Sequence, residues 1–285
     1  MFKKLLIVAL VLAFTAAPVF ALEDFQFDKS KVSIGVEYSI EDKDIDTPVL
    51  ADIQLGNFLG GTLTTTLKDF EVQTELLKLG YELSESATPY LLVGLAQIDM
   101  KQQLNGAIQL GKFNGGTTLM QTDMNEGDIA YGVGIGGDVA QYKGIVLSYD
   151  ARYWTTSVDG SGNNLSILPD FTSIKLNNNV DVDYNELDLA LILSKTIDMT
   201  DAEGNAKIVQ SLTPSIGYRY SQSNVNVENK TSIGPLAMES ETNYRSYNHD
   251  ALIGLEAQIN DQVSAKVAGI VGDNKGVMVS VGYKF

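Results

Sequence analysis

Period-two alternation runs from Lys31 to the C-terminus and constrains the fold of this chain more than any other feature. In KVSIGVEYSI (residues 31–40) every second residue is apolar, and DIAYGVGIGGDV (residues 128–139) repeats the pattern. Such alternation is typical of an extended strand with one apolar and one polar face. Polar stretches rich in Gly and Asn separate segments of about ten residues. We predict ten strands, at about 31–40, 72–84, 89–99, 128–139, 144–155, 184–196, 208–220, 248–259, 262–271 and 276–285.

The two faces of these strands indicate which side meets lipid. Leu, Val, Ile and Tyr line the apolar face, as in Leu187, Leu189 and Leu191, whereas the other face carries most strand glycines and charges of both signs. A charge on the lipid face of a barrel costs about 2–4 kcal/mol at the membrane midplane, whereas a lumen can pair or hydrate charges. Closure also leaves no unpaired sheet edge in hydrocarbon. The sequence therefore predicts an all-β, transmembrane antiparallel up-and-down β-barrel of about ten strands, with eight or twelve as alternatives.

The charged residues on the inward face form one candidate site. In a narrow ten-strand barrel we expect them to make an internal salt-bridge network, with the wall of a conducting pore as the alternative reading. Inward glycines either leave space for a pore or let side chains from opposite walls meet. The predicted lumen charges are Lys78, Glu82, Asp138, Asp150, Arg152, Asp188, Arg219, Glu256 and Lys266.

Tyrosines and connection lengths orient the barrel. Outward tyrosines lie toward the segment ends, where an aromatic girdle would meet the lipid headgroups. Connections after the even strands are mostly short, while those after the odd strands run to about 25–30 residues, except for a short GDNKG. Short periplasmic turns and long, extended extracellular hairpins match this asymmetry. The predicted girdle is Tyr38, Tyr81, Tyr149, Tyr153, Tyr218, Tyr220 and Tyr283.

A ten-residue string occurs twice in the first two long connections. IQLGNFLGGT at 53–62 and IQLGKFNGGT at 108–117 differ at only two places. We interpret the repeat as a duplicated β-hairpin whose reversals lie at Gly60-Gly61 and Gly115-Gly116, because adjacent glycines tolerate the positive φ angles of tight turns. The tips could make one surface that pairs with a partner strand. Neutral duplication and a tip folded inward as a plug are the alternatives.

The N-terminus and composition bound the location and the partners. MFKKLLIVALVLAFTAAPVFA (residues 1–21) has the basic start, apolar run and small-residue exit of a cleaved signal peptide, followed by a short periplasmic segment at 22–30 and the barrel domain at 31–285. The chain has no cysteine, and its net charge of −16 disfavours nucleic acid. We expect no cofactor.

The C-terminal strand VMVSVGYKF, with Tyr283 and the terminal Phe285, carries a family resemblance. It resembles the C-terminal signature of Gram-negative outer-membrane β-barrels, and residues 31–285 are similar to the broad group of OmpA, OmpX and the opacity proteins. The resemblance implies an outer-membrane location, contact with lipid and lipopolysaccharide, and recognition by the barrel-assembly machinery. It is silent on function, because this fold hosts pores, adhesins and enzymes alike.

Two further patterns are weaker. Asp181 and Asp183 alternate in an acidic segment and could share a divalent cation, although a solvated acidic surface explains them as well. His249, the single histidine, precedes Asp250 near the outer rim and invites comparison with the omptin proteases. Adjacent residues point to opposite sides of a strand, so with Asp250 in the lumen His249 would face outward.

These patterns favour a non-enzymatic barrel with a structural or adhesion-like role and a possible surface ligand. The alternative is a porin-like narrow passive channel for ions or small solutes. The third reading is an omptin-like or lipid-modifying enzyme.

Overall fold

The computed structural model describes residues 28–45, 49–55, 59–110, 113–162, 177–199, 209–233 and 236–285. The predicted signal peptide and most of the segment 22–30 lie outside these residues. The described part begins with one 3-10 turn, η2 (Lys29–Lys31), which Asp28 caps by accepting a hydrogen bond from the backbone N–H of Ser30. No helix in this part of the chain is long and apolar enough to cross a membrane.

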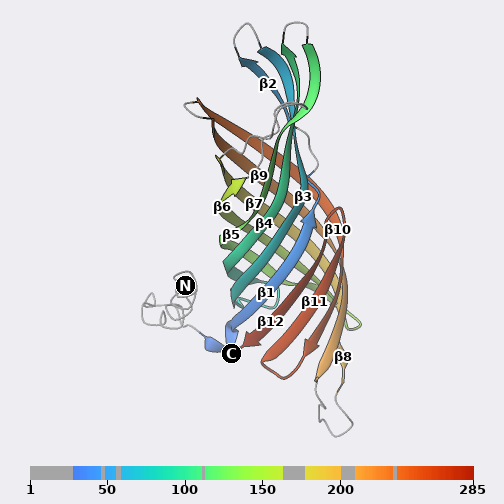
Figure 1. Cartoon of the computed structure of the whole chain (residues 1–285). Helices are drawn as coiled ribbons and strands as arrows, with labels where there is room; N and C mark the ends of the chain where they lie inside the picture. Colours follow the sequence, from blue (N-terminus) through green and yellow to red (C-terminus); the bar gives the residue numbers. More distant parts are fainter. Residues whose placement is uncertain are drawn as a thin grey trace.

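Ten long strands form a closed antiparallel barrel, as predicted (Figure 1). Closure occurs at β1, which pairs with β12 on one side and with β3 on the other. Two shorter strands, β2 (Val49–Leu55) and β8 (Ile197–Asp198), pair with β3 and β9 outside the barrel wall. The barrel strands are β1 (Val32–Lys43), β3 (Leu59–Tyr81), β4 (Thr88–Leu110), β5 (Phe113–Tyr142), β6 (Ile145–Gly162), β7 (Asn177–Lys195), β9 (Ser211–Ile233), β10 (Leu236–Gln258), β11 (Val263–Gly272) and β12 (Lys275–Lys284).

Short turns close one end of the barrel, which we take as periplasmic because outer-membrane barrels place their short turns there. The tightest joins β5 to β6 at Lys143-Gly144, where both residues have positive φ, 51° and 77°. Two central residues with positive φ are the conformation of a type I′ hairpin turn. The C-terminus lies at the same end (Figure 1).

The membrane half of the barrel is inverted relative to a soluble protein. On β7 the outward Leu191 is 53% exposed, whereas the inward Asp188 is 3% exposed. Outward side chains of β9 and β10 follow the same rule, since Ile216 and Ile253 are both exposed. Lipid is the solvent in which this surface is stable, because exposed aliphatic side chains on all sides would be costly in water.

Farther from the periplasm the same strands reverse their polarity. On β7, Val180, Val182 and Tyr184 point inward and are fully buried, while Asp181 and Asp183 point outward. The inward phase does not change along the strand, because Val182 and Asp188 lie an even number of positions apart. The strand therefore leaves the lipid and enters water between Leu187 and Asn185.

This reversal explains why most strands are longer than predicted. Much of the sequence assigned to long surface loops continues the sheet, so that β9 runs to Ile233 rather than to about residue 220. In this part of β9, polar residues that face outward alternate with buried valines: Asn224, Asn226 and Glu228 face outward, and Val225 and Val227 are buried. The predicted loops were therefore too long and the predicted strands too short. The alternation with period two continues above the membrane, but the outward residues there are polar, so the segment does not look like a membrane strand.

Above the membrane the barrel opens into two facing sheets. Hydrogen-bond pairing between β5 and β6 ends at Ala130 with Thr156, and pairing between β10 and β11 ends at Asp250 with Gly272. One sheet is β3–β4–β5, and the other is β6–β7–β9–β10. We call this part the extracellular sandwich.

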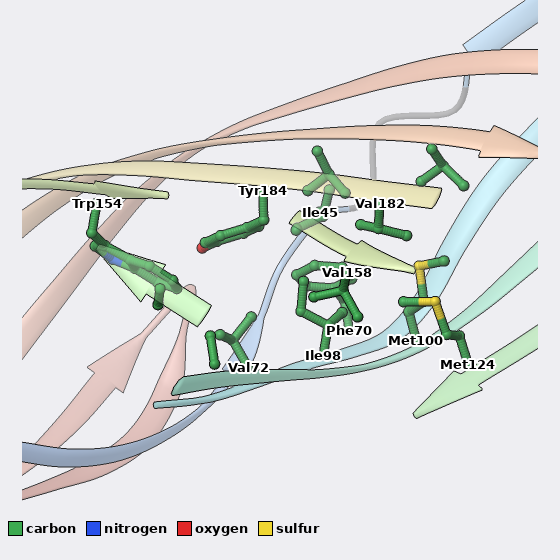
Figure 2. Close-up of a cluster of buried hydrophobic side chains, with 14 of the residues drawn as sticks. Ile45, Phe70, Val72, Ile98, Met100, Met124, Trp154, Val158, Val182 and Tyr184 are labelled. Carbon is green, nitrogen blue, oxygen red and sulfur yellow. The ribbon is translucent and has the colours of Figure 1, made fainter. Parts of the chain in front are cut away.

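An apolar core fills the space between these sheets (Figure 2). Phe70 of the first sheet stacks on Tyr184 of the second at 5.7 Å, and Trp154 lies 5.0 Å from the same ring. Gln102 donates a hydrogen bond of 3.0 Å to the Tyr244 hydroxyl across the sandwich, and burial raises the pKa of Tyr244. The sandwich is therefore a conventional water-facing fold with an apolar interior.

Strands β2 to β5 project beyond the sandwich as one sheet, which we call the tip sheet (residues 49–55, 59–64, 104–110 and 113–120; Figure 1). The predicted reversals at the glycine pairs are wrong: Gly60 pairs with Gln54, and Gly115 pairs with Ile108. Strand pairing resumes at Leu59 and Phe113, so both glycine pairs lie in the returning strands. The two nearly identical strings continue differently, since three residues follow Leu55 before pairing resumes and two follow Leu110.

Candidate functional site

Eight charged side chains fill the middle of the lumen, and we call them the charge cluster. Seven of them are buried, and Arg152 is half-buried. They are Glu37, Glu41, Lys43, Arg152, Glu186, Asp188, Arg219 and Asp250, contributed by β1, β6, β7, β9 and β10. Three cations therefore meet five carboxylates. Each is held in place by a strand of the closed wall, so the cluster depends on long-range pairing and not on any local motif.

The two arginines bridge opposite walls. Arg152 donates from Nη1 to Glu37 at 2.6 Å and from Nε to Asp188 at 2.7 Å. Arg219 donates from Nη2 to Glu41 at 2.7 Å and to Asp250 at 2.8 Å. Charge-assisted hydrogen bonds of this length are among the strongest in proteins, and the fork of a guanidinium reaches two acids at once.

Lys43 and the last hairpin complete the cluster from the extracellular side. The Lys43 ammonium donates to Glu41 and Glu186, and Glu186 also accepts a hydrogen bond from the Tyr184 hydroxyl at 2.8 Å. Asn274, in the short connection between β11 and β12, is fully buried and donates to Asp250 at 3.0 Å through Nδ2. The short GDNKG connection thus inserts its Asn into the top of the lumen.

Below the cluster a cavity of about 290 Å³ occupies the periplasmic half of the lumen. Asp150 projects into it and accepts a hydrogen bond from the Tyr90 hydroxyl at 2.7 Å, while the Lys78 ammonium lies 3.6 Å from Asp150 and 3.6 Å above the Tyr90 ring. Gly134 makes room for that ring, because a Cβ there would come within 2.3 Å of it. The cavity ends at Arg152, Asp188 and Arg219.

Above the cluster the apolar core closes the lumen again. Val72, Trp154 and Tyr184 follow the charged layer on the inward faces of β3, β6 and β7, and Met100, Val182 and Val227 follow them toward the tips. Within the described residues the lumen is thus filled over two successive layers, first of ion pairs and then of apolar side chains.

The structure divides the nine predicted lumen charges into three groups. Arg152, Asp188 and Arg219 belong to the charge cluster. Lys78, Asp150, Glu256 and Lys266 line the cavity below it, with Glu256 and Lys266 opposite each other on β10 and β11. Glu82 and Asp138 lie at the periplasmic end, where Glu82 pairs with Lys284 at 2.6 Å and Asp138 accepts a hydrogen bond from Ser148 at 2.7 Å.

Five cluster residues were missed in the predicted set. Glu37, Glu186 and Asp250 carry the inward phase in the sequence and could have been included on that ground. Glu41 and Lys43 were hidden in the acidic stretch EDKDID, which suggests a solvated surface. Strand β1 places Glu41 and Lys43 inside and exposes Asp42, so the period of two was the signal that could have found them.

The weaker candidates lie on the outer surface. Asp181 pairs with Lys230 at 3.1 Å and Asp183 accepts a hydrogen bond from Ser157 at 2.6 Å, so these carboxylates have different partners. His249 faces outward from β10, where its ring stacks on Tyr218 and its Nδ1 bonds the Tyr218 hydroxyl.

Aromatic side chains surround the apolar belt. Tyr38, Tyr153 and Tyr218 are exposed on the outer surface, and Tyr149 near the periplasmic turns donates to the carbonyl of Ser86 at 3.0 Å. Tyr81 and Tyr220 are half-buried. Tyr283 and Phe285 of the predicted assembly signal contact each other edge to face, with ring centroids 4.9 Å apart, and both are exposed.

Comparison with known proteins finds no matching family model and no matching curated sequence. Among solved structures, the toluene transporter TbuX of Ralstonia pickettii aligns with 10% identity over 89% of each chain and a TM-score of 0.36. The β domain of the Bordetella autotransporter BrkA aligns with 15% identity over 89% of this chain and 99% of that one, with a TM-score of 0.40. The Pseudomonas putida toluene transporter TodX aligns with 10% identity over 90% of this chain and 88% of that one, with a TM-score of 0.31.

At these scores the neighbours carry no argument about this chain, and they do not single out the OmpA, OmpX and opacity-protein group. The class rests on the molecule itself: a closed antiparallel wall, an exposed aliphatic belt and a charged interior define an integral membrane β-barrel. With its short turns at one end and long hairpins at the other, the chain forms a closed transmembrane β-barrel of ten strands.

Proposed function

We propose that this protein is a non-conducting outer-membrane barrel that displays the extracellular sandwich and the tip sheet at the cell surface, in an envelope-structural or adhesion-like role. The observation that carries the proposal is the filled lumen. Charge cluster and apolar core follow each other along the barrel axis, so a solute would have to pass both.

The charge cluster resists opening because its members are buried and mutually paired. Removing one partner of a buried ion pair typically costs about 3–5 kcal/mol, since the other charge is left unpaired in a poor solvent. A pore through this layer would separate Arg152 and Arg219 from carboxylates on other strands. The cavity below the cluster is accordingly a blind recess on the periplasmic side.

The external features support a display role. The belt of exposed aliphatic side chains and the outward tyrosines suit contact with lipid and lipopolysaccharide, while the sandwich buries its own core above that belt. The single histidine points outward and its imidazole bonds Tyr218, an arrangement that favours a non-enzymatic role over an omptin-like one. Export by a signal peptide and insertion by the barrel-assembly machinery through the C-terminal strand belong to the same proposal.

Planar-bilayer recording tests the closed lumen. The full chain, expressed in a Gram-negative host and purified from outer membranes, should give no steady single-channel current, while an Arg152→Ala, Arg219→Ala double variant should show at least leak events if it folds. Heat-modifiable gel mobility verifies that each sample is folded. Steady conductance of the unaltered protein would overturn the proposal and favour the narrow channel.

Binding assays test the display role. Removing both repeated strings, 53–62 and 108–117, leaves Thr65 and the core below them in place, so the barrel should still show heat-modifiable mobility. Loss of adhesion to surfaces or to other cells is expected for this variant. Undiminished adhesion by a folded, tip-deleted barrel would remove the tips from the function.

A further inference from the structure

The repeated string has a structural consequence, because its two copies pair with each other inside one molecule. Gly60 and Gly61 of the first copy lie opposite Gln109 and Ile108 of the second. The returning arm of copy one therefore binds the outgoing arm of copy two, in antiparallel register. This internal junction lies at the middle of the tip sheet, between β3 and β4.

The outer edges of the tip sheet are also one outgoing arm and one returning arm of the repeat. One edge is β2, the outgoing arm of copy one, and the other is β5 above Ala130, the returning arm of copy two. In the part of the chain that the structure describes, no strand pairs with the outer side of either edge at residues 49–55 or 113–120. The backbone N–H and C=O groups that point outward there are available to another strand.

We propose that the tip sheet binds a second copy of this chain edge to edge, with β5 of one molecule adding to β2 of the next and repeating the internal junction between β3 and β4. The inference deepens the display role and rests on it, because the tips must stand outside the membrane. Shifting the internal register by the 55-residue repeat gives the expected pairs: Gly115 with Gln54, Gly116 with Ile53 and Thr117 with Asp52.

Strand direction places both molecules in the same membrane. Strand β5 runs from the tip toward the membrane and β2 runs away from it, so these edges are antiparallel when two barrels stand side by side with the same orientation. Between two facing membranes the same two edges would be parallel and could not repeat the internal junction. The proposed assembly is therefore lateral, and it can continue from molecule to molecule because each chain keeps one free edge of each kind.

The edge sequences agree with this assignment. Natural proteins protect exposed edge strands with charges, prolines or bulges. The segment FNGGTTLMQT (113–122) has no charged residue and no proline, and VLADIQL (49–55) has only Asp52. By contrast, the open edge of β10 in the sandwich carries Glu239, Glu241 and Arg245. Apart from Asp52 and one irregularity in β5, where Leu119 is skipped in the pairing with β4, the two edges that carry the repeat lack these protective features.

Site-specific disulfide formation tests the register, since the chain has no cysteine of its own. Two differently tagged single variants, Gln54→Cys and Gly115→Cys, are co-expressed in a Gram-negative host, and outer membranes are oxidised. Directly opposed residues on neighbouring strands have the Cα separation that a disulfide needs, so a mixed dimer carrying both tags is expected. Pairing Gln54→Cys with Gly116→Cys is the matched control, because a shift of one residue places the thiols on opposite faces, and loss of the mixed dimer is expected.

An internal standard separates failure to assemble from failure to fold. The double variant Gly60→Cys, Gln109→Cys reports the internal junction and should close within one chain. If it closes while Gln54→Cys and Gly115→Cys give no mixed dimer, the proposed assembly is wrong. Equal yields from the Gly115 and Gly116 variants, or dimers of either variant alone, would also overturn it. Bilayer recording is a separate readout, so a conducting barrel would refute the display role without affecting the cross-link.

Discussion

The membrane half of the barrel and the extracellular sandwich are built from the same strands but have opposite polarity. In the membrane half, Leu191 faces out and Asp188 faces in; in the sandwich, Asp181 faces out and Val180 faces in. The backbone continues without a change of phase between them. The comparison teaches that the solvent outside each segment, lipid or water, dictates which face is apolar, while the inside takes the complementary character.

The interiors differ in how they are stabilised. The membrane half holds its walls together with ion pairs among eight charged side chains, because its apolar residues are needed outside. The sandwich holds its sheets together with apolar contacts such as Phe70 on Tyr184, because water outside favours their burial. The same kind of substitution should therefore change the stability of the membrane half and of the sandwich by different amounts.

The largest effect is expected in the charge cluster. Arg219→Ala leaves Glu41 and Asp250 without their shared cation in a buried layer, and it should lower the free energy of unfolding by about 3–5 kcal/mol. Urea titration of the folded protein in lipid vesicles, followed by heat-modifiable mobility, measures this loss. If Arg219→Ala lowers the free energy of unfolding by less than the removal of a surface side chain does, the cluster is hydrated and its charges are weakly coupled.

The next largest effect separates lipid from water on a single strand. Leu191→Arg places a charge on the lipid face of β7 and should destabilise the barrel by about 2–4 kcal/mol. Asn185→Arg lies on the same outward face but above the lipid, and should change stability by no more than about 0.5 kcal/mol. The same vesicle titration compares both variants. Equal losses of stability in the two variants would place Asn185 inside the membrane and move the lipid boundary toward the tips.

A smaller effect is expected at the glycine under Tyr90. In Gly134→Ala the added Cβ collides with the Tyr90 ring, and overpacking of this kind typically costs about 1–3 kcal/mol. The double variant Gly134→Ala, Tyr90→Leu removes the ring and should recover part of the loss. If the single variant is as stable as the unaltered protein, the ring is free to move into the cavity below the charge cluster.

The smallest effect is expected on the outside of the sandwich. Lys230 pairs there with Asp181 and Glu228 in full contact with water, an arrangement that raises the pKa of Lys230. Water and salt screen such pairs, so Lys230→Ala should leave the urea midpoint unchanged within error. A measurable loss that disappears in high salt would show that exposed ion pairs support the sandwich as well.

The sequence by itself determined the class of fold and indicated which connections are short, and it favoured ten barrel strands over eight or twelve. Each follows from local alternation: an apolar face without charge, as in Leu187 to Leu193, is compatible with lipid outside and little else. It also indicated that His249 faces outward, because Asp250 has the inward phase.

Only the tertiary structure decided which charges meet, where the strands end and how the repeated strings are used. Arg219 and Glu41 are 178 residues apart, and nothing near either residue identifies the other. Strand ends were misplaced because the reversal of polarity above the membrane looks like a loop when only one face is considered. The glycine pairs were assigned to turns on local propensity, yet both lie in strands. Gly60 pairs with Gln54 and Gln109, and Gly115 pairs with Ile108, because hydrogen bonding across a sheet outweighs the preference of a short segment.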